Sequence, residues 1–414
     1  MGRRIVVCVD GTNNAPGDGM TNVQRLNRIL QRSEEQIVYY QPGVGTVEPT
    51  SMSTPWGRRA LMVLDSISAV MLRRHVCSAY RYLMGEYRNG DTIYAFGFSR
   101  GAYAVRVLAG MLRKVGLLQR GLEEMVDFAW RAYAQHGNHE AADEFRNAYG
   151  RYVPSIHFLG LFDTVSAVGS PWRPTTFDYT FANDHVEIVR HALALDEHRA
   201  MFVQNLWREP TPEDPPTKHS TNVRQVWFAG VHADIGGGYP EAERGLSLIP
   251  LAWMRDQAEQ AGLIFRPKLT ARLFAGADDA TTTAVTDVVD ANAGAKIHDE
   301  LQSHRAWHLL EWLPIPRWRP DERGGWERRW RVHAGRARDV PEESLVHTSV
   351  GVRKSRLSYR PRPALANIRD EPPATPDRPT APQGEANDIS RLMQALPEEF
   401  LIEPPDDTQG PPRA

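Results

Sequence analysis

The sequence predicts an α/β protein whose central sheet is mostly parallel, with helices on both faces. Short, uninterrupted apolar segments of strand length alternate along the chain with longer segments whose apolar residues recur at helical spacing. Three of the strand-like segments also end in polar residues that can take part in chemistry. Because the carboxyl ends of parallel strands share one edge of a sheet, we expect a site at that edge.

The first part of the chain shows this alternation most clearly. Residues 4–9 form a β-branched apolar run that stops at Asp10, and a helix capped by Thr21 or Asn22 follows. The pattern then predicts a strand, one long helix or two, a strand, a helix and an amphipathic segment, at residues 36–40, 61–87, 93–96, 102–109 and about 121–149. This order is the crossover arrangement of a parallel sheet.

The second part begins regularly and then becomes less regular. Strands are predicted at residues 156–162 and 223–231, with a helical piece at 191–199 and a helix at 246–263. We expect residues 264–345, which are rich in tryptophan, proline and arginine, to form an irregular insertion or lid-like layer. Residues 1–360 are predicted to be one catalytic domain, and residues 361–414 a Pro-rich, largely disordered tail.

Composition excludes some classes of function. The 414 residues carry a formal net charge of -2, so no broad basic surface favours nucleic acid as a partner. The apolar run near the N-terminus is too short for a signal peptide, and no stretch reaches the about 20 apolar residues of a spanning helix. We expect folding in the cytoplasm, although export of a folded protein would leave no such mark. The two cysteines, Cys8 and Cys77, are expected to be buried thiols.

Residues 91–106 (DTIYAFGFSRGAYAVR) contain the strongest motif of the chain. A predicted strand enters the pentapeptide GFSRG and a predicted helix leaves it, which is the pattern of a G-x-S-x-G nucleophile elbow. Gly97 and Gly101 would let the helix and the strand cross closely beneath the serine. We therefore expect Ser99 to be a nucleophile at the carboxyl end of a central strand.

A serine hydroxyl needs a base within hydrogen-bond reach and an anion that orients this base. His232 is the candidate base and Asp163 the candidate anion, because each follows a predicted strand at the same edge as Ser99. The chain order Ser, Asp, His is that of the α/β-hydrolase fold. A second assignment stays open, in which Asp234 is the orienting anion and His347 is the base.

Acyl transfer also needs N–H donors that stabilise an oxyanion. The backbone N–H of Arg100 is one candidate, and an amide of the Gly11-Thr12 loop is the other. Further residues are expected to line the site: Asp10, Gly97, Gly101, Gly236 and Gly237. Since no cluster of His, Asp or Glu has metal-binding spacing, we expect neither a metal nor another cofactor.

Five sequence blocks occur in order across about residues 5–260: VCVDGTNN, GFSRGAYAVR, FLGLFDTVSAVG, HALALDEHR and VWFAGVHADIGGGY. Together they resemble the DUF2235 family of α/β-hydrolase-like proteins, which includes a class of phospholipase effectors of bacterial type VI secretion. The resemblance implies an α/β-hydrolase core, a triad at Ser99, Asp163 and His232, and hydrolysis of phospholipid esters. It also implies secretion by a type VI system into target cells, with a secretion-apparatus or immunity protein as partner.

The first hypothesis is therefore a phospholipase of the A1 or A2 type that works through an acyl-enzyme. The alternatives are a carboxylesterase for small esters and an inactive α/β-hydrolase-fold binding module, because a fold does not fix a function. The Trp-rich stretch is the local candidate for a transient contact with a membrane surface, since tryptophan suits the interface between lipid and water.

Overall fold

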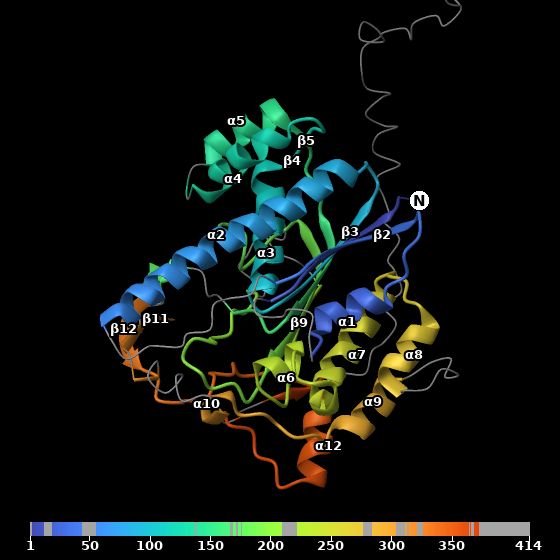
Figure 1. The fold of residues 1–414 in the computed structure, drawn as a ribbon, viewed down its shortest axis with the longest axis vertical. Helices are drawn as coiled ribbons and strands as arrows, with labels where there is room; N and C mark the ends of the chain where they lie inside the picture. Colours follow the sequence, from blue (N-terminus) through green and yellow to red (C-terminus); the bar gives the residue numbers. More distant parts are fainter. Residues whose placement is uncertain are drawn as a thin grey trace, which may run out of the picture. The chain divides into compact units, whose positions relative to one another are not determined.

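The computed structural model describes residues 2–11, 19–43, 55–135, 137, 139–165, 169–170, 173–174, 176–208, 222–275, 284–303, 311–312, 314–320, 326–363, 365 and 368–371. Eight strands form its central sheet: β1 (Arg4–Val9), β2 (Gln36–Gln41), β3 (Thr92–Phe98), β6 (Ile156–Phe162), β9 (Val186–Ala194), β10 (Asn222–Phe228), β13 (Leu345–Val346) and β14 (Arg369–Asp370). Their spatial order is β14-β13-β10-β9-β6-β3-β1-β2 (Figure 1). All neighbouring strands are parallel, so the predicted α/β-hydrolase-like sheet is confirmed.

The described helices are α1 (Asn22–Ile29), α2 (Pro55–Glu86), α3 (Arg100–Val115), α4 (Val126–Ala134), α5 (His139–Tyr149), α6 (His232–Gly236), α7 (Gly245–Gln260), α8 (Pro267–Ala275), α9 (Val285–Asn292), α10 (Glu300–Ser303) and α12 (Thr348–Arg356). Short strands outside the main sheet are β4 (Leu117–Leu118), β5 (Gly150–Tyr152), β7 (Gly169–Ser170) and β8 (Arg173–Pro174), and a longer pair is β11 (Pro314–Pro320) with β12 (Trp326–Val332). No described helix is both long enough and apolar enough to cross a bilayer.

The sheet has an apolar core on each face. Ile5, Val7 and Val9 of β1 pack in one core with residues of α2 and α3. Val6 and Cys8 pack in the other core with residues of α1 and α7. Figure 1 shows these two pairs of helices on opposite sides of the sheet. Because both faces are covered, β1, β3 and β6 are nearly continuous apolar runs, and this explains why the sequence predicts them well.

One predicted element is wrong. Residues 191–199 were expected to be helical, but residues up to Ala194 belong to β9, which lies between β6 and β10. Val189 to Ala194 are buried without interruption. Unlike β1, β3 and β6, this strand carries Glu187, Arg190 and His191 among its apolar residues, so it lacks the continuous apolar run that reveals a buried strand.

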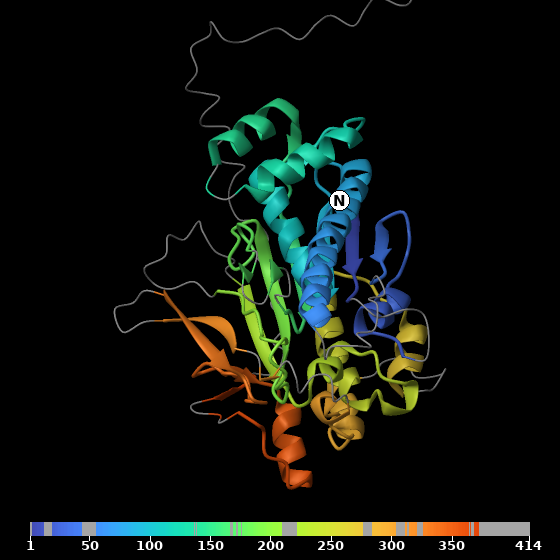
Figure 2. The ribbon, with the colours of Figure 1, turned by 60° about the vertical axis from the view of Figure 1, so that its left-hand side comes forward.

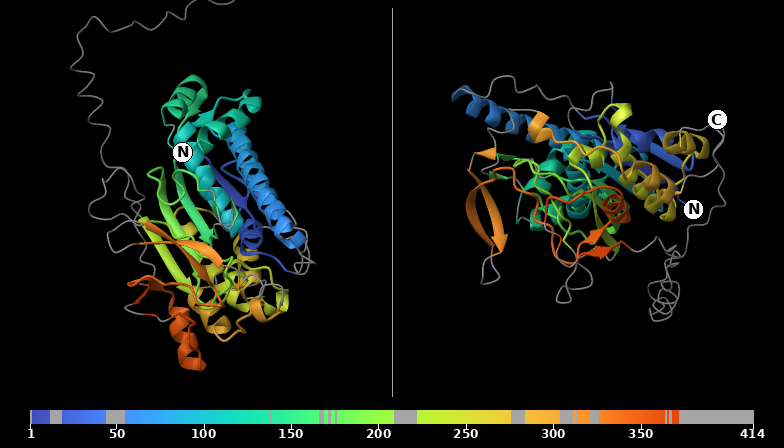
Figure 3. Two further views of the ribbon diagram at one scale, coloured as in Figure 1. Left: turned by 90° about the vertical axis from the view of Figure 1, so that its left-hand side faces the viewer. Right: turned by 90° about the horizontal axis from the view of Figure 1, so that it is seen from below.

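The C-terminal part is more regular than expected. Residues 264–345, predicted to be an irregular insertion, contain α8, α9, α10 and the antiparallel β11–β12 hairpin. Figure 2 and Figure 3 show this hairpin at the periphery of the fold. A short part of the predicted tail joins the sheet, since β14 pairs with β13 beyond residue 360. Residues 372–414 of that tail lie outside the described residues.

Candidate active site

Ser99 occupies a sharp turn between β3 and α3. Its backbone angles are φ 57° and ψ -121°, in a region that residues with a side chain rarely adopt. The Ser99 N–H donates to the carbonyl oxygen of Phe162 in β6 at 3.0 Å. Although Ser99 is the N-cap residue of α3, its side chain makes no capping hydrogen bond. Ser99 as a residue is 8% exposed, and its hydroxyl is not used to cap the helix.

Two glycines allow this turn. A Cβ atom at Gly97 would overlap the backbone of Ala102 in α3. A Cβ atom at Gly101 would overlap the carbonyl groups of Val9 and Asp10 at the end of β1. The absence of side chains at both positions lets α3 begin directly above the ends of β3 and β1.

His232 and Asp163 form a hydrogen bond at the same edge of the sheet. Asp163 follows β6 with φ 41°, and His232 is the first residue of α6, a few residues after β10. His232 Nδ1 lies 2.5 Å from Asp163 Oδ2. The ring of Phe98, the residue before Ser99, lies 4.7 Å from the His232 ring between centroids. The aspartate, the histidine and the serine turn are therefore neighbours, and within the described residues no hydrogen bond joins Ser99 Oγ to His232.

Asp163 is buried and has a counter-charge that the sequence did not indicate. Arg338 binds both carboxylate oxygens, with Nη1 to Oδ1 at 2.6 Å and Nη2 to Oδ2 at 2.9 Å, and the Ala194 N–H donates to Oδ1 at 3.0 Å. Burial favours a raised pKa, but the charge of Arg338 and the hydrogen bond from His232 outweigh it and hold the pKa of the Asp163 carboxyl well below its usual range. Asp163 is therefore an anion that accepts the His232 hydrogen bond.

The His232 imidazole is neutral near neutral pH. Burial lowers the pKa of His232 below its ordinary value, although the hydrogen bond to Asp163 acts in the opposite direction. A second aromatic ring, that of Phe202, packs against the imidazole at 4.8 Å between centroids. Since a neutral imidazole that donates from Nδ1 carries its lone pair on Nε2, His232 has the tautomer that a general base needs.

A buried ion pair supports the loop around His232. The Glu197 carboxylate accepts the backbone N–H of His232 at 3.1 Å and binds the Arg199 guanidinium through both oxygens, at 2.9 and 2.7 Å. Burial opposes ionisation of Glu197, but the hydrogen bonds and charge of Arg199 lower its pKa to about 2. Arg199 also lies over the Phe202 ring, 3.7 Å from its centroid. Both charged residues belong to the sequence block HALALDEHR, which gave a family signal but no hint of this role.

The alternative pair, Asp234 and His347, is not formed. Asp234 Oδ1 lies 2.7 Å from Nδ1 of His298, and Asp234 Oδ2 accepts the Val231 N–H at 3.0 Å. His347 is the N-cap residue of α12, where its Nδ1 accepts the Ser349 N–H at 3.2 Å. Each member of the alternative pair therefore has a different partner, His298 for Asp234 and Ser349 for His347.

The predicted oxyanion donors differ in their surroundings. Arg100 is the first residue of α3, so its backbone N–H has no carbonyl acceptor within the helix. The Gly11 N–H donates to Asp10 Oδ1 at 2.7 Å. Asp10 is buried and also accepts from the Thr21 hydroxyl at 2.7 Å, so this carboxylate organises the chain after β1. Thr12 lies outside the described residues.

Gly236 and Gly237 fit α6 against its neighbours. A Cβ atom at Gly236 would overlap the Phe98 ring, which itself contacts His232. Gly237 has φ 78° and forms a bridge with Thr21 at the start of α1. The two glycines therefore allow close packing of α6 against Phe98 and the start of α1. No group of three or more His, Cys, Asp and Glu side chains in the described ranges is arranged to hold a metal ion.

Residues 3–257 match the family model described as the catalytic domain of Tle1-like phospholipase effectors of type VI secretion. The chain belongs to this Tle1-like family. The match covers every strand that carries Ser99, Asp163 or His232. Arg338 lies outside the matched range, which explains why the family motifs do not reveal it.

Three individual proteins resemble this Tle1-like chain. An uncharacterized yeast protein, YEL023C of Saccharomyces cerevisiae, is 29% identical over 87% of this chain and 80% of its own length. The crystal structure of an uncharacterized protein from Pseudomonas aeruginosa is 20% identical, with a TM-score of 0.41 over 71% of this chain and 53% of that one. The Tle1 effector bound to the VgrG spike is 18% identical, with a TM-score of 0.32 over 57% of this chain and 51% of that one. The chain thus spans about half the length of both solved structures.

Proposed function

We propose that this Tle1-like protein is a serine hydrolase that cleaves carboxylic ester bonds of phospholipids, as a phospholipase of the A1 or A2 type. The observation that carries the proposal is the buried hydrogen bond between Asp163 and His232 beside the strained Ser99 turn. Acyl transfer requires a neutral, oriented imidazole within reach of a serine hydroxyl, and the Ser99 hydroxyl makes no capping hydrogen bond that would withhold it. Membership of a phospholipase effector family supports lipid as the substrate class.

The proposed reaction has two halves. Ser99 Oγ attacks the ester carbonyl carbon while His232 Nε2 takes the hydroxyl proton, and the Asp163 anion stabilises the imidazolium that forms. The tetrahedral intermediate then collapses, and the leaving lysophospholipid alcohol receives that proton from His232. In the second half, water loses a proton to His232 and its oxygen attacks the acyl carbon. The Oγ–acyl bond then breaks, the fatty acid leaves, and His232 returns the proton to Ser99 Oγ.

The oxyanion of the intermediate needs two donors. We assign the first to the Arg100 N–H at the start of α3, where the helix N-terminus also favours negative charge. The second donor stays a prediction for the loop after β1. Since the Gly11 N–H donates to Asp10, the Thr12 amide is the better candidate.

The family also suggests where the protein acts and what it meets. We propose delivery by a type VI system, with the secretion apparatus and an immunity protein as partners, because the family is one of type VI effectors. We further propose a transient membrane contact through Trp312 and Trp330, which are 69% and 58% exposed. Tryptophan side chains favour the interface between lipid and water.

A Ser99→Ala variant tests the proposed function. We expect this variant to lose phospholipid hydrolysis and labelling by a fluorophosphonate while it keeps the wild-type circular dichroism spectrum, because only one hydroxyl is removed. Phospholipid vesicles with differently labelled acyl chains would distinguish A1 from A2 cleavage, and short p-nitrophenyl esters would reveal a small-ester enzyme. A Ser355→Ala variant, whose exposed hydroxyl bonds only to the Val352 carbonyl, is the control. Full hydrolysis by Ser99→Ala would reject the mechanism. If the wild type shows no hydrolysis and no labelling in any of these assays, a binding module is favoured.

A further inference from the structure

Arg338 is the most completely bonded side chain of the site. Its guanidinium uses all five N–H donors: two reach Asp163, two reach the Phe202 carbonyl at 3.1 and 2.7 Å, and one reaches the Ala194 carbonyl at 3.1 Å. The side chain is only 4% exposed. This geometry fixes the guanidinium in one orientation, and with it the plane of the Asp163 carboxylate.

The segment that carries Arg338 is itself fastened to the site. It follows β12, and its anchor is the buried Glu311. Glu311 Oε2 binds the His333 ring and the Gly335 N–H, both at 2.8 Å, while Oε1 accepts the Ala200 N–H at 2.5 Å. Ala200 belongs to the loop after β9, so one carboxylate joins both sides of the contact. The segment that carries Arg338 is thereby connected, through buried hydrogen bonds, to the edge of the sheet at which Asp163 and His232 lie.

We propose that Arg338 is a positioning residue of the active site, which holds Asp163 ionised and oriented toward His232 and opposes protonation of the Asp163–His232 pair. This inference rests on the proposed function. It also assigns a role to the segment after β12. This segment supplies the active site with a charged group that lies 175 residues beyond Asp163 in the chain.

The charge of Arg338 affects how easily the buried Asp163–His232 pair takes up a proton. A buried carboxylate without a counter-charge favours its protonated form, because burial disfavours the ion. A nearby positive charge also disfavours the imidazolium form of His232. Whether the added proton rests on Asp163 or on His232, the pair is inactive as a base. Loss of the Arg338 charge therefore makes the pair easier to protonate by both routes.

Other charged or titratable groups around the pair do not replace Arg338. Glu197 and Arg199 bind each other and so compensate each other's charge. His191 packs near Asp163, and burial lowers its pKa to about 3, so it stays neutral over the working range. Among the described residues, Arg338 is the cation that directly contacts the Asp163 carboxylate.

The test compares the pH dependence of kcat/KM in variants of the full chain. In the wild type we expect the acid limb to lie below about 6.5, the ordinary pKa of histidine. For Arg338→Gln we expect this limb to move to higher pH by about one unit or more, with kcat/KM near neutral pH reduced at least about tenfold. Arg338→Lys keeps the positive charge but loses the two-nitrogen contact with the Asp163 carboxylate. For this variant we expect a lower kcat with an unshifted acid limb of the pH profile. Guanidinium ion added to the solution should partly restore the kcat/KM of an Arg338→Ala variant.

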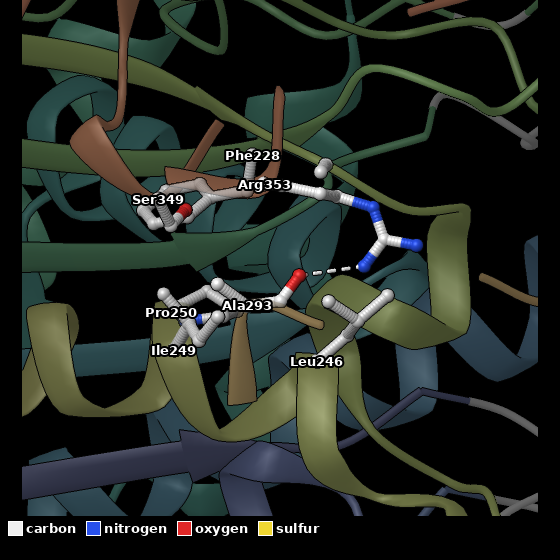
Figure 4. Close-up of a pocket in the computed structure, with 8 residues that line it drawn as sticks. Phe228, Leu246, Ile249, Pro250, Ala293, Ser349 and Arg353 are labelled. Atoms are coloured by element: carbon white, nitrogen blue, oxygen red, sulfur yellow. Dashed lines mark hydrogen bonds between the residues drawn. The ribbon is translucent and has the colours of Figure 1, made fainter. Parts of the chain in front are cut away.

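Arg353 offers a matched control. It is as buried as Arg338 but donates to two backbone carbonyls, those of Ala293 and Ala295, at 2.7 and 2.6 Å. Arg353 lines a small crevice together with Leu246 and Ala293 (Figure 4), and no residue of the proposed triad is part of this lining. Arg353→Gln removes a buried arginine without touching Asp163, so we expect an unchanged pH profile per folded molecule.

The outcomes separate the inference from the proposed function. Wild-type kcat and an unshifted acid limb in Arg338→Gln, with Ser99→Ala inactive, would overturn the role of Arg338 and leave the hydrolase standing. Activity in Ser99→Ala would overturn the hydrolase itself. If Arg338→Gln does not fold, Arg338→Lys decides: a wild-type kcat in that variant contradicts the inference, and a reduced kcat with an unshifted limb supports it.

Discussion

At the scale of single residues, the site is marked by backbone strain. Ser99 and Asp163 both have positive φ angles, 57° and 41°, although neither is a glycine. Such conformations cost about 1–3 kcal/mol each and persist only where the surroundings enforce them. Two of them on neighbouring strand ends, next to a buried Asp-His hydrogen bond, indicate that the fold places these side chains at the expense of local stability.

The two candidate bases give a prediction at this scale. We expect His232→Ala to lower kcat by several orders of magnitude, because it removes the imidazole that Asp163 orients. His347→Asn keeps an N-cap side chain on α12 and should retain wild-type kcat. Steady-state hydrolysis of a soluble ester measures both variants. A dead His347→Asn beside an active His232→Ala would reverse the assignment of the base.

At the scale of elements, the turns depend on close backbone contacts. The glycine pattern of GFSRG, read from the sequence, corresponds to a real approach of α3 to the ends of β1 and β3. Strand ends could be predicted because buried parallel strands are continuous apolar runs that stop at polar turns. The strand β9 could not, because Glu187, Arg190 and His191 interrupt its apolar run.

Gly101→Ala tests the element that carries Ser99. The new methyl group would overlap the Val9 and Asp10 carbonyls, so we expect a loss of about 1–3 kcal/mol in the free energy of unfolding and a large loss of activity. Gly85→Ala is the control, since a Cβ atom there meets open space in α2 and should be neutral or slightly stabilising. Chemical denaturation measures both. Equal stability of the two variants would show that the close approach at Gly101 does not matter.

At the scale of the whole molecule, the first two thirds of the chain are more predictable from sequence than the rest. The meeting of Asp163 with His232 could be predicted, because the carboxyl ends of parallel strands share one edge of the sheet, but the order of the strands could not. Arg338 could not be predicted, because it contacts Asp163 across 175 residues and belongs to no motif. The hairpin β11–β12 also escaped prediction, since its prolines and arginines obscure any strand pattern.

The exposed tryptophans give a prediction for the molecule on a membrane. We expect Trp312→Ser and Trp330→Ser to reduce hydrolysis of phospholipid vesicles about tenfold while hydrolysis of a soluble ester stays unchanged, because only the interfacial contact is lost. Phe128→Ser, which alters an exposed aromatic residue on α4, should change neither rate. Figure 1 shows α4 apart from the hairpin, toward the other end of α2. Equal losses on both substrates would show that the tryptophans stabilise the fold and do not contact lipid.

The most direct test of Ser99 as the nucleophile is to identify the residue that a fluorophosphonate modifies. After labelling, proteolysis and mass spectrometry, we expect the phosphonyl group on Ser99 alone, and we expect its rate of attachment to fall sharply in His232→Ala. A label on a different residue, or phospholipid hydrolysis that continues after Ser99 is fully modified, would contradict the proposal that this serine is the nucleophile.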